Sequence, residues 1–286
     1  MKKNRQMITG LLLCGSLVLT ACQNQASSEP VNTLIPEGSQ IQNTRTGALV
    51  TPQQLLNVLS DAPMVIVGEE HTNVAHHDIE LWLLQHLEKK RPQGSILLEM
   101  ITQDQQPAVD EVKQMLAAGN NLQESRIQED LHWNTGWPWS MYGKIVMTGL
   151  GSHSALLSAN IPRTRILDIY KEPTFPAGEQ SSRADVHDAL SRTITQMHGG
   201  DIQPNQLRAM LAIQQHRDRF MAQQLLNARH PGILLVGGYH AAKDVGVPLH
   251  IQDLNGPPPV VLMLTTQGTP VSAAQADYAW SVPAVK

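Results

Sequence analysis

Aromatic residues, charged residues, cysteines and long apolar runs are all scarce in this chain. Aromatics make up 4% of the sequence and charged residues 16%, against 41% hydrophobic residues. Because so little charge accompanies so many apolar residues, the chain is not intrinsically disordered. A formal net charge of −4 gives no basic footprint for nucleic acid. No apolar run reaches the roughly 18 residues that a membrane-spanning helix needs.

Histidine is the residue type that stands out against this background. The chain has 12 histidines but only 4 tyrosines and 2 phenylalanines. A length of 286 residues suits one large domain or two modest ones. The position of each histidine relative to the expected strands is therefore the main guide to a site.

The N-terminus has the layout of a secretory signal. Residues 1–5 carry three positive charges, and the apolar stretch over residues 7–21 is too short to span a bilayer. Residues 19–22 read Leu-Thr-Ala-Cys, which resembles a bacterial lipobox, where the cysteine is acylated, for example with palmitate, and becomes the new N-terminus. An ordinary signal peptide with a chance cysteine is the alternative. We expect a lipoprotein signal peptide over residues 1–21 and lipidation of Cys22.

The same reading sets the expected domain organisation and location. Gln23 follows the cysteine, and by Gram-negative sorting rules a residue other than Asp favours the outer membrane of the cell envelope. Residues 22–46 are rich in Gln, Asn, Ser, Thr and Pro and predict a lipidated flexible tether. Residues 47–286 then form a single domain. It has no disulfide, because Cys14 leaves with the signal and Cys22 carries the lipid.

Short apolar runs alternate with longer stretches of helical spacing. The expected buried strands are residues 64–67, 95–98, 165–169, 232–236 and 260–264. The expected helices are residues 52–60, 74–90, 104–118, 140–158, 182–198, 205–229 and 240–251. This alternation predicts an α/β fold with a mainly parallel central sheet flanked by helices. A helical insertion or cap lies between the second and third strands.

Chemically active side chains follow most of these strands. In open parallel sheets, ligands bind beyond the carboxyl ends of the strands. The residues placed there are Glu69, Glu70 and His71 after the first strand, Glu99 after the second, Asp168 in the third, and Tyr239 and His240 after the fourth. This convergence, more than any single residue, predicts a site.

The richest segment, residues 68–77, reads Gly-Glu-Glu-His-Thr-Asn-Val-Ala-His-His. Glu69, His71 and one of His76 or His77 are placed to meet at a cation, since imidazole with carboxylate suits a transition metal. The alternative is that Glu69 and His71 orient the loop while the paired histidines cap the next helix. The spacing matches none of the common metalloprotease motifs.

A second glycine motif ends the fourth strand. Residues 237–240 repeat the Gly-x-x-His form of residues 68–71, so two strands can present His71 and His240 to each other, with Glu99 between them. On the helix 205–229, Gln214 and Asp218 fall on the apolar face by their i, i+4 spacing. They either support a site histidine from behind or form a plain salt bridge or cap.

Three of the five tryptophans, Trp133, Trp137 and Trp139, fall close together in this aromatic-poor chain. They either form a wall for a flat ligand or fix the helical insertion onto the sheet. An exposed aromatic wall suits a porphyrin, and a nearby phenolate can ligate ferric iron. Tyr142 and Tyr239 are the candidate ligands.

Several of these segments together resemble the ChaN family of iron-regulated, haem-binding bacterial surface lipoproteins. The resemblance spans about residues 50–255, in family order. It is carried by residues 68–73 with His76 and His77, residues 98–100, Trp139 and Tyr142, residues 160–163, residues 214–221 with Asp218, and residues 237–248. The family is similar to the wider Tiki/TraB group, whose paired Gly-x-x-His motifs and glutamate are thought to bind metal. That likeness implies His71, Glu99 and His240 as the matching positions.

The resemblance implies a membrane-anchored lipoprotein that binds haem for haem or iron uptake. By charge and position, Lys171 and Lys243 are the candidates to meet the haem propionates. The alternative is a metal-dependent hydrolase in which Glu69 or Glu70 serves as general base. A noncatalytic partner of a receptor or transporter, and a homodimer, stay open. The sequence favours a haem-binding protein over an enzyme, and haem over a divalent metal as cofactor.

Overall fold

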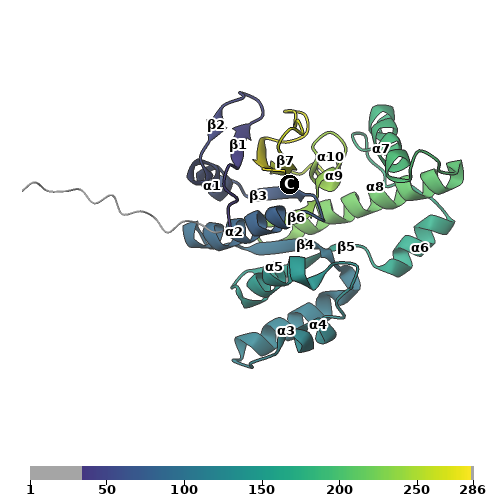
Figure 1. The fold of residues 1–286 in the computed structure, drawn as a ribbon. Coiled ribbons are helices and arrows are strands. Elements are labelled where there is room, and N and C mark those ends of the chain that lie inside the picture. The colour runs from purple at the N-terminus through teal and green to yellow at the C-terminus, as the bar shows by residue number, and fades with distance from the viewer. Residues whose placement is uncertain (1–33, 285–286) are drawn as a thin grey trace, which may run out of the picture. The chain divides into compact units, whose positions relative to one another are not determined.

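An eight-stranded sheet forms the centre of the protein. A computed structural model describes residues 34–284, and the sheet order is β2-β1-β8-β7-β3-β6-β4-β5 (Figure 1). In chain order the strands are β1 (Gln40–Asn43), β2 (Leu49–Val50), β3 (Met64–Glu69), β4 (Ser95–Thr102), β5 (Ala155–Asn160), β6 (Gly232–Gly237), β7 (Val260–Thr266) and β8 (Tyr278–Val282). All pairings from β8 to β5 are parallel, and β1 pairs antiparallel with β8 and β2. The expected mainly parallel α/β fold is confirmed.

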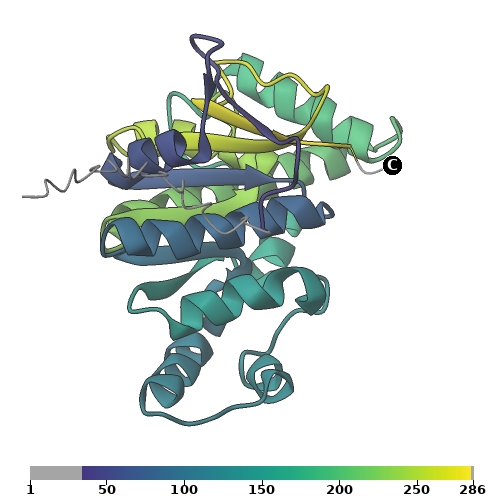
Figure 2. The ribbon, with the colours of Figure 1, turned by 60° about the vertical axis from the view of Figure 1, so that its left-hand side comes forward.

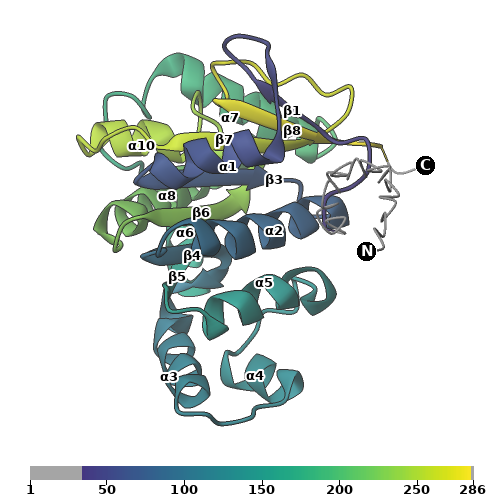
Figure 3. The ribbon, with the colours of Figure 1, turned by 90° about the vertical axis from the view of Figure 1, so that its left-hand side faces the viewer.

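Helices cover both faces of this sheet. They are α1 (Pro52–Asp61), α2 (Val74–Lys90), α3 (Gln106–Ala117), α4 (Glu124–Asp130), α5 (Trp139–Gly151), α6 (Arg163–Lys171), α7 (Ala184–Met197), α8 (Pro204–Asn227), α9 (Gly238–Ala241) and α10 (Val247–Asp253), with a 3-10 turn, η1 (Gln103–Gln105), before α3. Figure 3 shows α1 and α2 in front of the strands and α8 behind them. Within residues 34–284, none of these helices is long and apolar enough to cross a membrane.

The helices between β4 and β5 form the expected insertion. Helix α5 packs on α2, and α3 packs on α5, so the insertion extends the helical layer of one face. Figures 1 and 2 both show α3 and α4 beyond the β5 edge of the sheet.

The central strands are continuous apolar runs in the sequence, because both faces of the sheet are buried. On β3, Val65 and Val67 belong to the core beneath α1, α2 and α5, whereas Met64 and Ile66 belong to the core beneath α8 and α10. This alternation follows from the two-residue period of a strand. Four of the five expected strands are found for this reason.

The third expected strand was wrong. Residues 165–169 lie inside α6, where Ile169 is buried and Asp168 is exposed, as an amphipathic helix requires. The third strand of the parallel sheet in chain order is β5, whose first residues fall at the end of the helix expected over residues 140–158. Helix α5 ends at Gly151, because Ser152 is extended and begins a turn into β5.

The folded chain also begins earlier than expected. Residues 40–43, placed in the tether, form β1, and Ile41 is buried against the core. The Thr44 hydroxyl donates a hydrogen bond to the carbonyl of Ala276 at 2.6 Å. A short strand with one buried side chain has no apolar run to reveal it. The expected signal peptide, Cys22 and the first part of the tether lie outside the described residues.

Gly68 is where the close packing of this fold can be tested. A Cβ at this position would lie 2.6 Å from the Ala241 Cβ and 2.8 Å from the Met263 sulfur. We expect Gly68→Ala to lower the free energy of unfolding by about 1–3 kcal/mol, because overpacking forces the backbone to shift. Urea unfolding of the full chain measures it. Gly151→Ala, where a Cβ would meet nothing within 4 Å, is the matched control and should cause no loss.

Candidate functional site

The turn after β3 is built around His76. Nδ1 of this buried imidazole accepts a hydrogen bond from the Glu70 N–H at 3.0 Å. Asn73 caps α2 by accepting from the Ala75 N–H at 3.1 Å. Burial lowers the pKa of His76, so the ring is neutral near pH 7 and keeps this acceptor role. His76 therefore supports the loop through its contact with the Glu70 N–H, whereas the helix cap expected of the paired histidines is made by Asn73.

Glu69, the last residue of β3, is the hub of the site. Its buried Oε1 accepts from the Tyr142 hydroxyl at 2.9 Å and lies 2.8 Å from His71 Nδ1. Its other oxygen, Oε2, lies 3.4 Å from His77 Nδ1. Three elements, namely β3, α2 and α5, therefore converge on one carboxylate.

His71 is the imidazole of this group that reaches the surface. Its side chain is 41% exposed, and its ring meets Trp137 edge-on with a centroid distance of 4.8 Å. Burial lowers the pKa of His71, but the hydrogen bond to Glu69 and the charge of Glu99 outweigh this effect, so the pKa is raised. His71 is therefore well placed to donate a proton to an anionic group.

Tyr142 lies beneath the surface. It is 1% exposed, and burial and the neighbouring Glu69 charge both raise the pKa of its phenol. A neutral, enclosed phenol that donates to Glu69 is a structural support. In this geometry it is not available to an iron at the surface, contrary to its role as a candidate haem ligand.

His77 and Glu80 lie deeper on α2, one turn apart. His77 Nε2 lies 3.1 Å from the His71 carbonyl oxygen, and His77 Nδ1 lies 3.4 Å from Glu80 Oε2. Glu80 is fully buried, and burial raises its pKa to about 7. Sequence reasoning missed Glu80. The signal was an acid within the apolar stretch of residues 79–84, three residues after His77.

Glu99 and His240 form a second buried group. Glu99 Oε2 accepts from the Gly237 N–H at 2.7 Å, and Glu99 Oε1 lies 3.4 Å from His240 Nε2. His240 Nδ1 contacts the Asp218 carboxylate and lies 3.0 Å from Gln214 Nε2. The two residues expected to support a site histidine are therefore both placed against His240. Asn160, in one of the segments that carry the family resemblance, donates to the Glu99 carbonyl at 3.0 Å.

The pKa shifts in this second group come from charge pairing that outweighs burial. Burial lowers the pKa of His240, yet the charges of Glu99 and Asp218 raise it to about 10. Burial raises the pKa of Glu99, yet the His240 charge lowers it to about 2. At neutral pH, His240 is an imidazolium between two carboxylates.

The structure brings three of the residues expected to bind a metal close together. A Cβ on Gly237 would lie 2.8 Å from His71 Nε2 and 3.6 Å from Glu99 Oε2, and Glu99 Oε1 lies 3.4 Å from His240 Nε2. Within residues 34–284, one set of three ligand-type side chains has donor atoms within 4.8 Å of one another, and it is Glu69, His77 and Glu80.

Other candidate residues are not brought to this cluster. Asp168 is exposed on α6, so its supporting role disappears with the wrong third strand. Glu70 is exposed, and its Oε2 lies 3.5 Å from the Thr266 hydroxyl, away from the place a general base would need. Lys243 Nζ pairs with Asp277 at 2.7 Å, whereas Lys171 is exposed at the end of α6.

The tryptophan segment fixes the insertion, and one of its rings also contacts the site. Trp133 donates to the Trp137 carbonyl at 2.8 Å, and Trp139 donates to Glu124 at 2.8 Å, so these two rings fix the insertion. Trp137 faces the site, because it contacts both His71 and Tyr142 edge-on.

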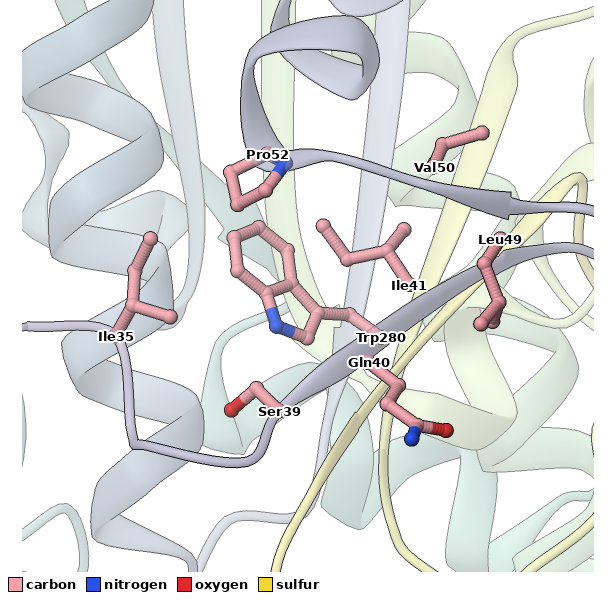
Figure 4. A pocket seen from close by; sticks show the side chains of 8 residues that line it. All are labelled: Ile35, Ser39, Gln40, Ile41, Leu49, Val50, Pro52 and Trp280. Atoms are coloured by element: carbon pink, nitrogen blue, oxygen red, sulfur yellow. The ribbon is translucent and has the colours of Figure 1, made fainter.

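An apolar cleft of about 160 Å³ lies elsewhere, beside the β1–β2 hairpin (Figure 4). Ile41, Leu49, Pro52 and Trp280 are among the side chains that line it. It contains no titratable group and none of the candidate site residues, so we assign it no chemistry.

Comparison with known proteins agrees with this geometry. Residues 55–251 match the family described as haem-binding uptake, Tiki superfamily, ChaN. The structure of ChaN of Campylobacter jejuni with cofacially bound haem is similar, with a TM-score of 0.79, 26% identity, and coverage of 85% of this chain and 96% of that one. No curated protein matches the chain.

Two more distant solved structures are also similar. Erythromycin esterase EreC has a TM-score of 0.48 and 14% identity, covering 86% of this chain and 84% of its own. The type III effector HopBA1 has a TM-score of 0.44 and 12% identity, covering 80% and 91%. Neither likeness is strong enough to carry an argument about function.

The His240 group predicts a pH dependence of stability. Because folding raises the pKa of His240, its protonated form contributes stability that is fully present below pH 6.5, its ordinary pKa, and is lost as the pH rises towards 10. Because folding lowers the pKa of Glu99, its ionised form contributes stability that is fully present above pH 4.5, its ordinary pKa, and is lost as the pH falls towards 2. The group therefore stabilises most between about pH 4.5 and 6.5.

Urea unfolding of the full chain in EDTA, measured across pH, tests this expectation. Between pH 6.5 and 10 the free energy of unfolding should fall by up to about 1.4 kcal/mol per pH unit from this group. His240→Gln should flatten that slope, whereas His153→Gln, which removes an exposed imidazole, should leave it intact. An unchanged slope in His240→Gln would show that the ion pair does not form.

Proposed function

The chain belongs to the haem-binding ChaN family of the Tiki superfamily, and from this premise we propose that it binds haem on the carboxyl edge of its sheet for haem or iron uptake. One observation carries the proposal: the strands that end at this edge, which also holds the half-exposed His71, are followed in the chain by exposed apolar and aromatic side chains. They are Val74, Leu167, Tyr170 and Tyr239, called the rim below.

The rim residues share one edge because of the sheet topology. Val74 follows β3, Leu167 and Tyr170 follow β5, and Tyr239 follows β6. These strands are parallel, so their carboxyl ends meet at one edge. β5 lies two strands from β6, about 10 Å away at the usual spacing. Exposed apolar side chains grouped in this way mark a binding surface, and a porphyrin face is apolar.

Tyr239 is the iron ligand that the rim supports best. Its side chain is 49% exposed on α9, whereas Tyr142 is enclosed and bonded to Glu69. Tyrosine is an established ligand of ferric haem. Its neighbour His240 is held by Asp218 and Glu99, so the backbone that presents Tyr239 is fixed. Of the two candidates to bind the haem propionates, Lys171, beside Tyr170, is the better one, because Lys243 already pairs with Asp277.

Hemin titration of the full chain in detergent tests the proposal. We expect a saturable Soret shift at micromolar hemin. Tyr239→Phe should weaken hemin binding at least about tenfold and remove the iron–phenolate signature from the resonance Raman spectrum, because the ligand oxygen is lost.

Matched tyrosine variants give this test its controls. Tyr142→Phe should keep the iron–phenolate signature, since its hydroxyl serves Glu69. Tyr170→Phe removes the other exposed rim tyrosine. If the iron–phenolate signature were lost in that variant alone, the iron ligand would be Tyr170 on α6 and not Tyr239. A chain that shows no Soret shift would end the haem proposal altogether.

We extend the proposal to lipid anchoring at the outer membrane of a Gram-negative cell. Its support is the sequence alone, namely the charged leader, the lipobox-like residues 19–22 and Gln23. A haem-binding domain tethered to a membrane would hold its cargo close to an uptake receptor or transporter. Lipid attachment also allows a domain without a spanning helix to stay at the membrane.

Acylation of Cys22 is testable in cells with labelled palmitate. We expect the wild-type chain to incorporate the label and to sediment with membranes, and Cys22→Ala to do neither. Cys14→Ala is the matched control, because this cysteine lies within the predicted signal and should leave labelling intact. Labelling that depends on neither cysteine would contradict the lipobox prediction.

A further inference from the structure

We infer that Glu69, His77 and Glu80, called the inner triad below, form a buried site for a small divalent transition-metal ion. Their donor atoms lie within 4.8 Å of one another, and all three side chains are buried. Two of its members, His77 and Glu80, come from α2 and lie outside the Gly-x-x-His motifs, whereas Glu69 belongs to the first of these motifs. The inference does not rest on haem binding, which involves the exposed rim.

The contacts of His77 turn its Nδ1 towards two carboxylates. Nε2 lies 3.1 Å from the carbonyl oxygen of His71, an acceptor, so Nε2 carries a proton. Nδ1 lies 3.4 Å from both Glu69 Oε2 and Glu80 Oε2. Burial lowers the pKa of His77, but these two carboxylates outweigh this effect and raise it. Two buried carboxylates that face one imidazole need a positive species between them, which is a proton on Nδ1 or a metal ion that replaces this proton.

Both carboxylates of the inner triad also have an oxygen without a partner. Glu69 Oε2 and Glu80 Oε1 are both buried and have no hydrogen-bond partner. A single proton on Glu80 would satisfy one of these oxygens, whereas a cation satisfies both carboxylates. Glu69 is also oriented from behind, because its Oε1 is held by Tyr142 and His71. Outer hydrogen bonds of this kind hold ligands in place at metal sites.

The distances select the type of ion. Tetrahedral bonds of 2.0–2.1 Å to nitrogen and oxygen separate neighbouring ligand atoms by about 3.3–3.4 Å. Both separations from His77 Nδ1 are 3.4 Å, and all three donor atoms lie within 4.8 Å of one another. Calcium needs more oxygen ligands at longer bonds. One imidazole with two carboxylates therefore fits Zn²⁺ or a neighbouring divalent ion of the first transition row.

Metal titration of the full chain, stripped with EDTA and followed by calorimetry, tests the site. We expect one equivalent of Zn²⁺ to bind, and Co²⁺ to give the visible absorption of a tetrahedral centre. Glu80→Gln and His77→Gln should each weaken Zn²⁺ binding at least about tenfold. Glu88→Gln, which removes an exposed carboxylate from the same helix, should bind like the wild type.

Thermal unfolding with and without Zn²⁺ shows whether each variant is folded. Zn²⁺ should raise the melting temperature of the wild type and of Glu88→Gln, but not that of Glu80→Gln. If the wild-type chain binds no stoichiometric metal, the inference is overturned, and a proton rather than a metal ion lies between the side chains of the triad. Binding that survives Glu80→Gln but is lost in Glu99→Gln also overturns it, because the ion would then lie between His71 and Glu99.

A hemin titration of Glu80→Gln separates this inference from the proposed function. Loss of Zn²⁺ binding with the wild-type Soret shift retained would support the inner triad and leave haem binding untouched. Failure of the wild type to bind hemin would end the haem proposal without changing the metal result.

Discussion

The parallel pairing of β3 with β6, which sets Glu69 opposite Gly237, is the constraint on which the rest of the site depends. It brings the exits of two glycine-containing turns to one edge, so His71 and His240 approach the same carboxylate, Glu99. The missing side chains at Gly68 and Gly237 allow this approach, because a Cβ on either would meet atoms less than 3 Å away. A register shift of one residue would send these groups to opposite faces of the sheet.

Burial of charge explains why the polar side chains at this edge are so tightly organised. An unpaired carboxylate in the interior is too costly to keep, so each one recruits partners. Glu99 takes the Gly237 N–H and His240, and Asp218 supports the far side of that imidazole. Glu69 takes Tyr142 and His71. Each carboxylate of the inner triad still keeps one oxygen without a hydrogen-bond partner, Oε2 in Glu69 and Oε1 in Glu80, so the pairing of buried charge is incomplete between β3 and α2.

Strands that are buried on both faces of the sheet could be located from the sequence. The burial of polar side chains could not, because it depends on which distant segments pack against them. Continuous apolar runs located β3, β4, β6 and β7 because helices cover both faces. The sequence does not reveal β5, because this strand follows α5 without a clear break in apolar spacing. The apolar residues of α6 suggest a strand over residues 165–169 instead. Asp168 followed that error. Glu80 was missed because an acid in a helix reads as solvated until the opposite helix, α5, is known to cover it.

The fold separates two chemistries that the sequence places side by side. Tyr142 on α5 is enclosed with the carboxylates, whereas Tyr239 on α9 faces solvent with the apolar rim. A flat apolar ligand with anionic groups suits the rim, and a compact cation suits the interior. His71 is the only side chain that belongs to both within the described site, because its ring contacts Trp137 at the surface and Glu69 below.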